Sequence, residues 1–284
     1  MSVEAVERYY NECHVDYRVV WRSHRNLCIH FGYFDAEHTD HRSAVENMNR
    51  QMLRRTKIGP TDRTLDAGCG VGGSSFFIAS RTGARVTGIN IQPLHLEVAR
   101  AECRARGLAH LVDFEKRNYC GTGFDAESFD VVWALESVCH SDDKKAFLAE
   151  AYRVLRPGGR IVVGDFVQFL TGLDAHAARE MQIWLDGWAI PHLAGYGEFR
   201  DWMSEIGFDG VTSENITPHV MRSSRRLYKA SLIALPFSGF ATAMGWRSER
   251  QTANVRASYY QYRTIRAGLW GYAIYSGVKP DRAR

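Results

Sequence analysis

Short apolar runs alternate with longer amphipathic stretches along the middle of the chain, from about residue 62 to residue 165. This alternation is typical of strands that are each followed by a helix, and it predicts a parallel β-sheet. We expect strands at residues 64–67, 85–89, 112–116, 129–134 and 160–165. We expect the intervening helices at residues 73–81, 93–106 and 143–155, with a tight turn at residues 156–159 before the fifth strand.

The two ends of the chain are predicted to be mainly helical. Residues 3–20 and 41–57 lack helix breakers, and an aromatic loop at residues 29–35 separates them. After residue 165 we expect helices at residues 174–188, 196–206, 219–244 and 249–266, and strands at residues 211–216 and 269–278. Because no clear linker occurs, the pattern favours one domain. We divide it into an N-terminal helical lid (residues 1–60) and a core (residues 61–284) with cap segments at about 166–195 and 217–267.

Composition places the sequence among packed globular proteins. Hydrophobic residues make up 45% and charged residues 24% of the 284 positions, which excludes disordered and fibrous classes. The net charge of +4 is small and scattered, so we expect no nucleic acid partner. No apolar run is long enough for a membrane span, and the first residues lack the pattern of a secretory signal. The six cysteines show no zinc-type or paired spacing, so reduced thiols and a cytoplasmic location are expected.

The sharpest motif is a glycine-rich turn, LDAGCGVGG at residues 65–73, between the first predicted strand and its helix. Glycines let a backbone approach a ligand closely, and the helix start supplies free N–H groups. The carboxylate of Asp66 would favour a cationic ligand and repel phosphate. The spacing of Gly68, Gly70 and Gly72 is also one residue shorter than the dinucleotide fingerprint. The turn therefore predicts a cofactor site and disfavours an NAD-type oxidoreductase.

This motif occurs together with the alternating strands and with a Pro-Gly-Gly turn at residues 157–159. The combination resembles the class I, Rossmann-like methyltransferases that use S-adenosylmethionine. The resemblance covers about residues 62–165. It implies an α/β fold with a seven-stranded doubly wound sheet, N-terminal helices and a helical cap inserted among the late strands. It also implies S-adenosylmethionine as the cofactor. The residues that it assigns to cofactor binding are Asp66, Gly68, Cys69, Gly70, Asn90, Ile91, Gln92, Asn118, Tyr119 and Leu135.

Two of these positions depart from the usual pattern of the family. Asn90 stands where a carboxylate usually binds the ribose hydroxyls, although an amide can also hydrogen-bond to both hydroxyls. Asn118 stands where the adenine-contacting loop usually has an acidic residue. It is either the partner of the adenine amine or an ordinary asparagine of a surface loop.

Glu136 and His140 follow the fourth predicted strand, in the segment WALESVCH at residues 133–140. Ligands of open α/β sheets lie beyond the carboxyl ends of the strands, so both side chains are expected near the transferred methyl group. This segment, with Asn90, resembles the terpenoid C-methyltransferases, which act on sterols, tocopherols and prenyl groups. The C-terminal residues 268–279 are similar to the tocopherol type. Sugar O-methyltransferases of natural-product pathways share part of the pattern.

The chemistry of alkene methylation gives a separate reason to single out Glu136. Methylation of an alkene carbon leaves a carbocation, and a buried carboxylate can stabilise this cation and accept its proton. His140 would be a second base or would orient Glu136. Weaker candidates are His14, His24, His30 and Asp35. No HxxH or HxxE pair lies on a predicted helix, so we expect no metal site.

Aromatic and basic residues outside the core motifs are candidates for acceptor binding. Aromatic faces can hold a cation, and we expect Tyr33, Phe34, Trp184 and Trp188 to line the acceptor pocket; core packing is the alternative for each. Arginine binds phosphate in bidentate geometry. The run containing Arg222 and Arg226 would therefore suit a prenyl diphosphate, with a solvated helix face as the alternative.

The sequence thus predicts an S-adenosylmethionine-dependent C-methyltransferase. Its substrate is expected to be a hydrophobic small molecule, an isoprenoid or an isoprenoid-bearing compound of secondary metabolism, methylated through a carbocation-like intermediate. The alternatives are an O- or N-methyltransferase of a phenol, sugar or alkaloid, and a non-enzymatic binding module that keeps the fold. N-terminal helices in such enzymes act as a lid or exchange between subunits, so a homo-oligomer is one expectation.

Overall fold

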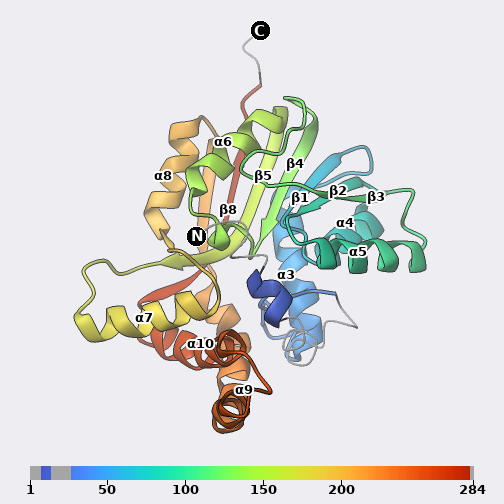
Figure 1. Cartoon of the computed structure of the whole chain (residues 1–284). Helices are drawn as coiled ribbons and strands as arrows, with labels where there is room; N and C mark the ends of the chain where they lie inside the picture. The colour runs from blue at the N-terminus through green and yellow to red at the C-terminus, as the bar shows by residue number, and fades with distance from the viewer. Residues whose placement is uncertain (1–7, 14–26, 282–284) are drawn as a thin grey trace.

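The centre of the molecule is one mixed β-sheet with helices on both faces (Figure 1). The computed structural model describes residues 8–13 and 27–281. Along the sheet the strands follow the order β3 (Val112–Lys116), β2 (Arg85–Asn90), β1 (Arg63–Ala67), β4 (Phe129–Leu135), β5 (Leu155–Gln168), β8 (Trp270–Val278) and β7 (Asp209–Asn215). A short strand, β6 (Ala194–Gly195), also pairs with β5. This path confirms the predicted doubly wound α/β sheet, to which β6 is an addition.

The sheet is parallel from β3 to β5, and β8 is inserted antiparallel between β5 and β7. Successive side chains of a strand point to opposite faces of a sheet. In β4, Val131 and Trp133 belong to one hydrophobic cluster, and Val132 and Ala134 belong to another. All four side chains are buried, as expected for a strand that is covered on both sides.

Two layers of helices cover these faces. The first layer contains α3 (His41–Thr56), α4 (Gly73–Thr82) and α5 (Pro93–Ala105), and the second contains α6 (Lys144–Val154) and α8 (Tyr196–Ile206). Local capping helps to set where these helices begin. The Asp40 carboxylate accepts hydrogen bonds from two backbone N–H groups at the start of α3, and Asp143 accepts one at the start of α6.

The remaining long helices form a bundle beside the sheet (Figure 1). In this bundle α7 (Ala175–Gly187) and α9 (Thr217–Ala243) both pack against α10 (Glu249–Arg266). Trp184 of α7 stacks on Trp270 at the start of β8, with ring centroids 4.1 Å apart. The bundle is therefore joined to the sheet through buried aromatic rings.

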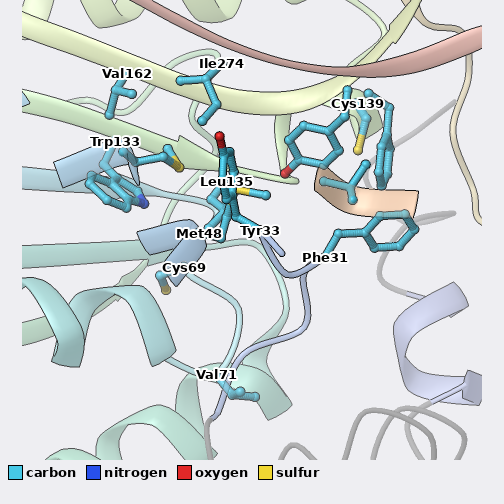
Figure 2. Packing of buried hydrophobic residues seen from close by; sticks show 14 of the residues in the cluster. Phe31, Tyr33, Met48, Cys69, Val71, Trp133, Leu135, Cys139, Val162 and Ile274 are labelled. Atoms are coloured by element: carbon cyan, nitrogen blue, oxygen red, sulfur yellow. The ribbon is translucent and has the colours of Figure 1, made fainter. Parts of the chain in front are cut away.

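The aromatic loop that precedes α3 is part of the core. Figure 2 shows Phe31 and Tyr33 of this loop in one cluster of buried side chains with Met48 of α3 and Leu135 of β4. The backbone N–H of Tyr33 donates to the carbonyl of Ala44, at 2.8 Å. The loop is thereby held against α3, close to the carboxyl end of β4.

The predicted helices and strands are confirmed to within a few residues, with two differences. The predicted turn at residues 156–159 lies inside β5, where the pairing with β4 moves from Leu155 directly to Arg160. Gly158 there has a φ of 72°, so the strand continues through an irregular stretch. Of the predicted helix at residues 3–20, only residues 8–13 are described, and they are helical. The rest of that prediction lies outside the described residues.

Candidate functional site

A cavity of about 750 Å³ lies at the carboxyl ends of β1, β2 and β4. The predicted site residues that line it are Asp66, Gly68, Cys69, Gly70, Asn90, Ile91, Tyr119, Leu135, Glu136 and His140. The other lining residues are Tyr10, Leu27, Cys28, Ile29, His30, Val71, Gly73, Ser74, His95 and Ser137. The cavity thus brings together the glycine turn, the ends of two further strands and the N-terminal segment.

The glycine turn forms the wall of the cavity next to β1. The backbone N–H groups of Gly68 and Cys69 both donate to the carbonyl of Ile89, at 2.9 and 3.0 Å. Gly68 has a φ of +88°, and a Cβ added to it would lie 2.3 Å from the Cβ of Ser137. Gly70 has a φ of +54° and faces open space, since an added Cβ would meet no atom within 4 Å. The two glycines therefore serve different purposes: one allows close packing, and the other leaves room beside the cavity.

Asp66 places a buried carboxyl group at this wall. Its Oδ2 accepts a hydrogen bond of 2.6 Å from the hydroxyl of Ser75. Burial raises the pKa of Asp66 to about 6, although the hydrogen bonds from Ser75 oppose this shift. Near neutral pH the carboxyl group is mostly ionised, and it favours a ligand with positive charge.

Three polar residues assigned to the cofactor take different places. Asn90 lines the cavity, and its Oδ1 accepts a hydrogen bond from the backbone of Gln92 at 3.0 Å. Gln92 is buried, caps the start of α5 and does not line the cavity. Asn118 also lies outside the lining, where its Oδ1 accepts a hydrogen bond from the backbone N–H of Cys120.

Glu136 is held in an unusual backbone conformation at the end of β4. Its φ of +48° lies in the left-handed region, which costs a non-glycine residue about 1–2 kcal/mol. Its Oε1 accepts hydrogen bonds from the backbone N–H of Phe31 at 2.6 Å and from the hydroxyl of Tyr272 at 2.9 Å. Burial raises the pKa of Glu136 well above its ordinary value; the charge of Asp165 adds to this rise, and the two hydrogen bonds oppose it. Such strain is found where the surroundings hold a side chain in place for function.

His140 is held between two hydrogen-bond partners. Its Nδ1 lies 3.0 Å from the carbonyl of Ala189, and its Nε2 lies 2.9 Å from the hydroxyl of Tyr10. The carbonyl can only accept, so Nδ1 carries the proton and Nε2 accepts from Tyr10. Burial lowers the pKa of His140 to about 4, so the ring is neutral near neutral pH.

An aromatic cluster adjoins Glu136 on the side of the α7–α9–α10 bundle. Phe166 is central to this cluster, with ring centroids 5.4 Å from both Phe31 and Tyr272 and 6.2 Å from Trp188. Phe31 and Tyr272 are also the two residues that donate hydrogen bonds to Glu136. The carboxyl group therefore lies at the border between the cavity and a set of buried rings.

The residues predicted to bind the acceptor do not line the cavity, and most lie in the core. Tyr33 stacks on His219, with ring centroids 4.0 Å apart, and Trp184 stacks on Trp270. Phe34 lies beneath the guanidinium of Arg222. Trp188 contacts Phe31 and Phe166 in the aromatic cluster, and Arg226 lies 3.4 Å from the ring nitrogen of His41.

Several residues that line the cavity or adjoin it had no signal in the sequence. Tyr10 and His95 come from separate helical segments, and their rings pack edge to face at the cavity. Tyr272 lies in the predicted last strand, but nothing in that pattern indicated a contact with Glu136. His30, a weaker candidate, lines the cavity, and burial lowers its pKa to about 4. His14 and His24 lie outside the described residues. Within the described part of the protein, no cluster of three or more histidine, cysteine or acidic side chains could hold a metal ion.

Comparison with known proteins agrees with this arrangement. Residues 65–163 match the model of a methyltransferase domain. The chain is 31% identical over 197 residues to 27-O-demethylrifamycin SV methyltransferase of Amycolatopsis mediterranei (strain S699), covering 69% of this chain and 71% of that protein. It is 38% identical over 141 residues to methyltransferase GfsG of Streptomyces halstedii, and there it spans about half of each protein (49% and 51%). A solved geranyl diphosphate methyltransferase, in complex with GPP and sinefungin, has a TM-score of 0.76 at 20% identity, over 98% of both chains.

Proposed function

This chain belongs to the class I S-adenosylmethionine-dependent methyltransferases, and we propose that it transfers the methyl group to a carbon atom of an isoprenoid or isoprenoid-bearing small molecule. The proposal that the acceptor atom is carbon rests on one observation. The carboxyl group of Glu136, a half-buried residue held in a strained conformation, lies between the cofactor cavity and a cluster of aromatic rings. A developing carbocation would be stabilised by both kinds of group.

The residues of the cavity suit S-adenosylmethionine, the cofactor of this family. Bound there, it supplies a methyl group attached to a positively charged sulfur. Asp66 offers a carboxylate to a cationic ligand, and Gly70 leaves open space beside the turn. Asn90 and Tyr119 add an amide and an aromatic ring to the lining. We propose these four residues, with Gly68, Cys69, Ile91 and Leu135, as the cofactor-binding set.

In the proposed mechanism Glu136 acts on the acceptor. When a carbon of the double bond gains the methyl group from the cofactor's sulfur, the methyl–sulfur bond breaks and the neighbouring carbon becomes positively charged. The cation must then lose a proton from a carbon beside the charged one, which restores a double bond. The carboxylate of Glu136 would stabilise this charge and accept the proton. Phe31 and Tyr272 fix the carboxylate through Oε1, so the group is positioned before the acceptor arrives.

A second candidate function is methyl transfer to a hydroxyl group. Two observations favour it. His140 is neutral at the cavity, with an Nε2 that can accept a proton once the Tyr10 hydroxyl moves away. One relative is also a methyltransferase of 27-O-demethylrifamycin SV. In this alternative, His140 or Glu136 would deprotonate the acceptor oxygen.

The N-terminal segment forms a further part of the proposal. Tyr10 lines the cavity and donates to His140, whereas Tyr9 donates to Asn254 of α10 at 3.0 Å. These contacts support a lid that would exclude water from the reacting groups. We propose that residues 1–60 carry this lid over a core of residues 61–284, with residues 8–13 at the cavity and with the aromatic loop and α3 packed against that core.

The test is a methyl-transfer screen with labelled S-adenosylmethionine against prenyl diphosphates, terpenoid indoles, sterols, tocopherol-type phenols and sugars. Wild type is run beside Glu136→Gln, His140→Gln and a surface control, Glu205→Gln. We expect transfer to an isoprenoid carbon, a loss of roughly 100-fold or more in kcat for Glu136→Gln, and full activity in the control. Cofactor affinity, measured by calorimetry, should be unchanged in Glu136→Gln.

Other outcomes would select another function. Transfer to oxygen alone, lost in His140→Gln and kept in Glu136→Gln, would replace the proposal with the hydroxyl alternative. Cofactor binding without transfer to any acceptor would instead favour the binding module.

A further inference from the structure

The helices α9 and α10 form a hairpin beside the sheet (Figure 1). Exposed apolar side chains gather at the end of this hairpin where the two helices are connected. Among the described residues, six of the eight large apolar side chains that are exposed lie there, and Leu170 and Val278 are the other two. The six residues, named the hairpin tip below, are Leu232, Ile233, Phe237, Phe240, Met244 and Trp246. Ile233, Phe237 and Trp246 are each more than 70% exposed, at 72%, 71% and 73%. A group of this kind marks an interaction surface.

The exposed side of α9 changes from apolar to basic between the tip and the end nearer the sheet. Residues three or four positions apart lie on the same side of a helix. Ile233, Phe237 and Phe240 follow this spacing at the tip, and the exposed Arg225 and Lys229 continue it toward the sheet. With a rise of about 1.5 Å per residue, Lys229 lies about 6 Å from Ile233 along the axis. An apolar end is thus followed directly by a basic zone.

The whole hairpin is strongly basic. Residues 217–266 contain nine arginine and lysine residues and one acidic residue, Glu249. This segment therefore has a formal charge of +8, whereas the complete sequence has only +4. The remainder of the molecule is net acidic, so the basic charge is concentrated on this hairpin, and Lys229, Arg247 and Arg250 are the basic residues near its apolar end.

We propose that the hairpin tip docks on an anionic lipid bilayer, with its aromatic residues among the headgroups and its basic residues close to the lipid phosphates. Tryptophan and phenylalanine are favoured at such interfaces, and basic residues beside them add electrostatic attraction. Within the described residues, no helix is long and apolar enough to cross a membrane. The contact is therefore peripheral and reversible.

The charge distribution favours a lipid surface over a second copy of this chain. In a symmetric dimer through the tip, the basic residues beside one tip, such as Lys229 and Arg247, would approach the same residues of the other copy. Like charges repel, and burying them against each other adds to the cost. An anionic bilayer presents an apolar interior and a negative surface, which match both properties of the hairpin.

The base of the hairpin tip is linked to the cavity through the N-terminal segment. Ser248, at the start of α10, donates to the carboxylate of Glu12, and Gln251 donates to the Glu12 carbonyl. Tyr10 of the same segment lines the cavity. In a molecule docked through the tip, the N-terminal segment beside the cavity would therefore lie near the bilayer, where isoprenoids dissolve. This consequence rests on the proposed function, whereas the docking itself does not.

The test is co-sedimentation of the full-length protein with vesicles of phosphatidylcholine alone and of an equimolar mixture with phosphatidylglycerol. We expect the wild type to bind the mixed vesicles and to be released by high salt, which screens the attraction. Phe237→Ser combined with Phe240→Ser should lower the partition coefficient roughly tenfold or more. Lys229→Gln should lower it about fivefold. Leu170→Ser, an exposed apolar residue elsewhere, is the matched control and should bind as wild type.

Two further readouts keep the result interpretable. Circular dichroism shows whether each variant is folded, and light scattering gives the oligomeric state. Equal binding by wild type and the double variant, or no binding by folded wild type, would overturn the proposal. A wild-type dimer that the double variant converts to monomer would assign the surface to a second copy instead. Vesicle binding is measured without any acceptor, so it fails or succeeds independently of the methyl-transfer screen.

Discussion

At the scale of single residues, two glycines of one turn have distinct physical reasons to be glycine. Both Gly68 and Gly70 have positive φ angles, which disfavour any residue with a Cβ. Only Gly68 also lacks room for a side chain, because an added Cβ would collide with Ser137. Ser137 in turn donates a hydrogen bond of 2.7 Å to the carbonyl of Ala67, so it cannot move away without losing that bond.

Alanine substitutions at these two glycines should therefore have different consequences. We expect Gly68→Ala to lower the free energy of unfolding by roughly 3 kcal/mol, through strain and the contact with Ser137. Gly70→Ala should lower it by only about 1 kcal/mol. Its added Cβ would occupy open space next to the cavity, so cofactor binding should weaken. Thermal unfolding and calorimetry measure the two effects. Equal losses of stability in both variants would contradict this account.

At the scale of elements, β8 determines the surroundings of Glu136. Because β8 pairs antiparallel with β5, Tyr272 lies opposite Phe166, and its hydroxyl reaches the carboxylate at the end of β4. Tyr275 points to the other face of the sheet, where its hydroxyl donates to the carbonyl of Tyr196 at 2.9 Å. The strand β8 thus contains Tyr272, which contacts Glu136, and Tyr275, a buried tyrosine away from the cavity.

This pair of tyrosines allows a controlled test of how β8 affects the site. The hydroxyl of Tyr272 donates to Glu136 and thereby lowers the pKa of that carboxyl group. Tyr272→Phe removes this effect, so the pKa of Glu136 rises further. If the ionised carboxylate is the active form, the acidic limb of the pH–rate profile should move to higher pH.

Tyr275→Phe is the control for this substitution. Tyr275→Phe loses the hydrogen bond to Tyr196, and Tyr272→Phe loses the contacts of its hydroxyl with Glu136 and with the carbonyl of Gly164. Each substitution should cost about 1–2 kcal/mol in stability. Only Tyr272→Phe should shift the profile. A shift in both variants, or in neither, would show that Tyr272 does not act through Glu136.

At the scale of the whole molecule, a few residues of the N-terminal segment connect the cavity with the helical bundle. Tyr10 contacts His140 at the cavity, and Tyr9 and Glu12 contact α10. These contacts join parts of the protein that are more than a hundred residues apart in sequence. The same short segment thus contacts both the cavity and the bundle.

Deleting residues 1–13 should remove the proposed lid from the cavity. We expect faster release of the cofactor, by roughly tenfold, because a closed lid limits dissociation. Stopped-flow measurements of cofactor release would test this. Tyr9→Phe, which removes the hydrogen bond to Asn254 and keeps the rest of the segment, should have a much smaller effect. An unchanged release rate after the deletion would contradict the role of the lid.

The sequence by itself determined the α/β units and the cofactor turn, because these depend on local patterns. Apolar runs of strand length, glycines at a strand-to-helix turn and capping residues act over a few positions, and they can be identified without the fold. Asp66 and Glu136 were found in this way, since each lies at the end of a strand. Both line the cavity.

Only the tertiary structure decided what surrounds these residues. The insertion of β8 between β5 and β7 brings together Glu136 and Tyr272, which are 136 positions apart. The pairing of Tyr10 with His140 spans 130 positions. Such contacts arise from strand order and helix packing, for which the local pattern has no signal. For the same reason, the sequence could not show where aromatic residues such as Tyr33 and Trp184 lie. Their residue types are common in substrate pockets, but both are packed in the core.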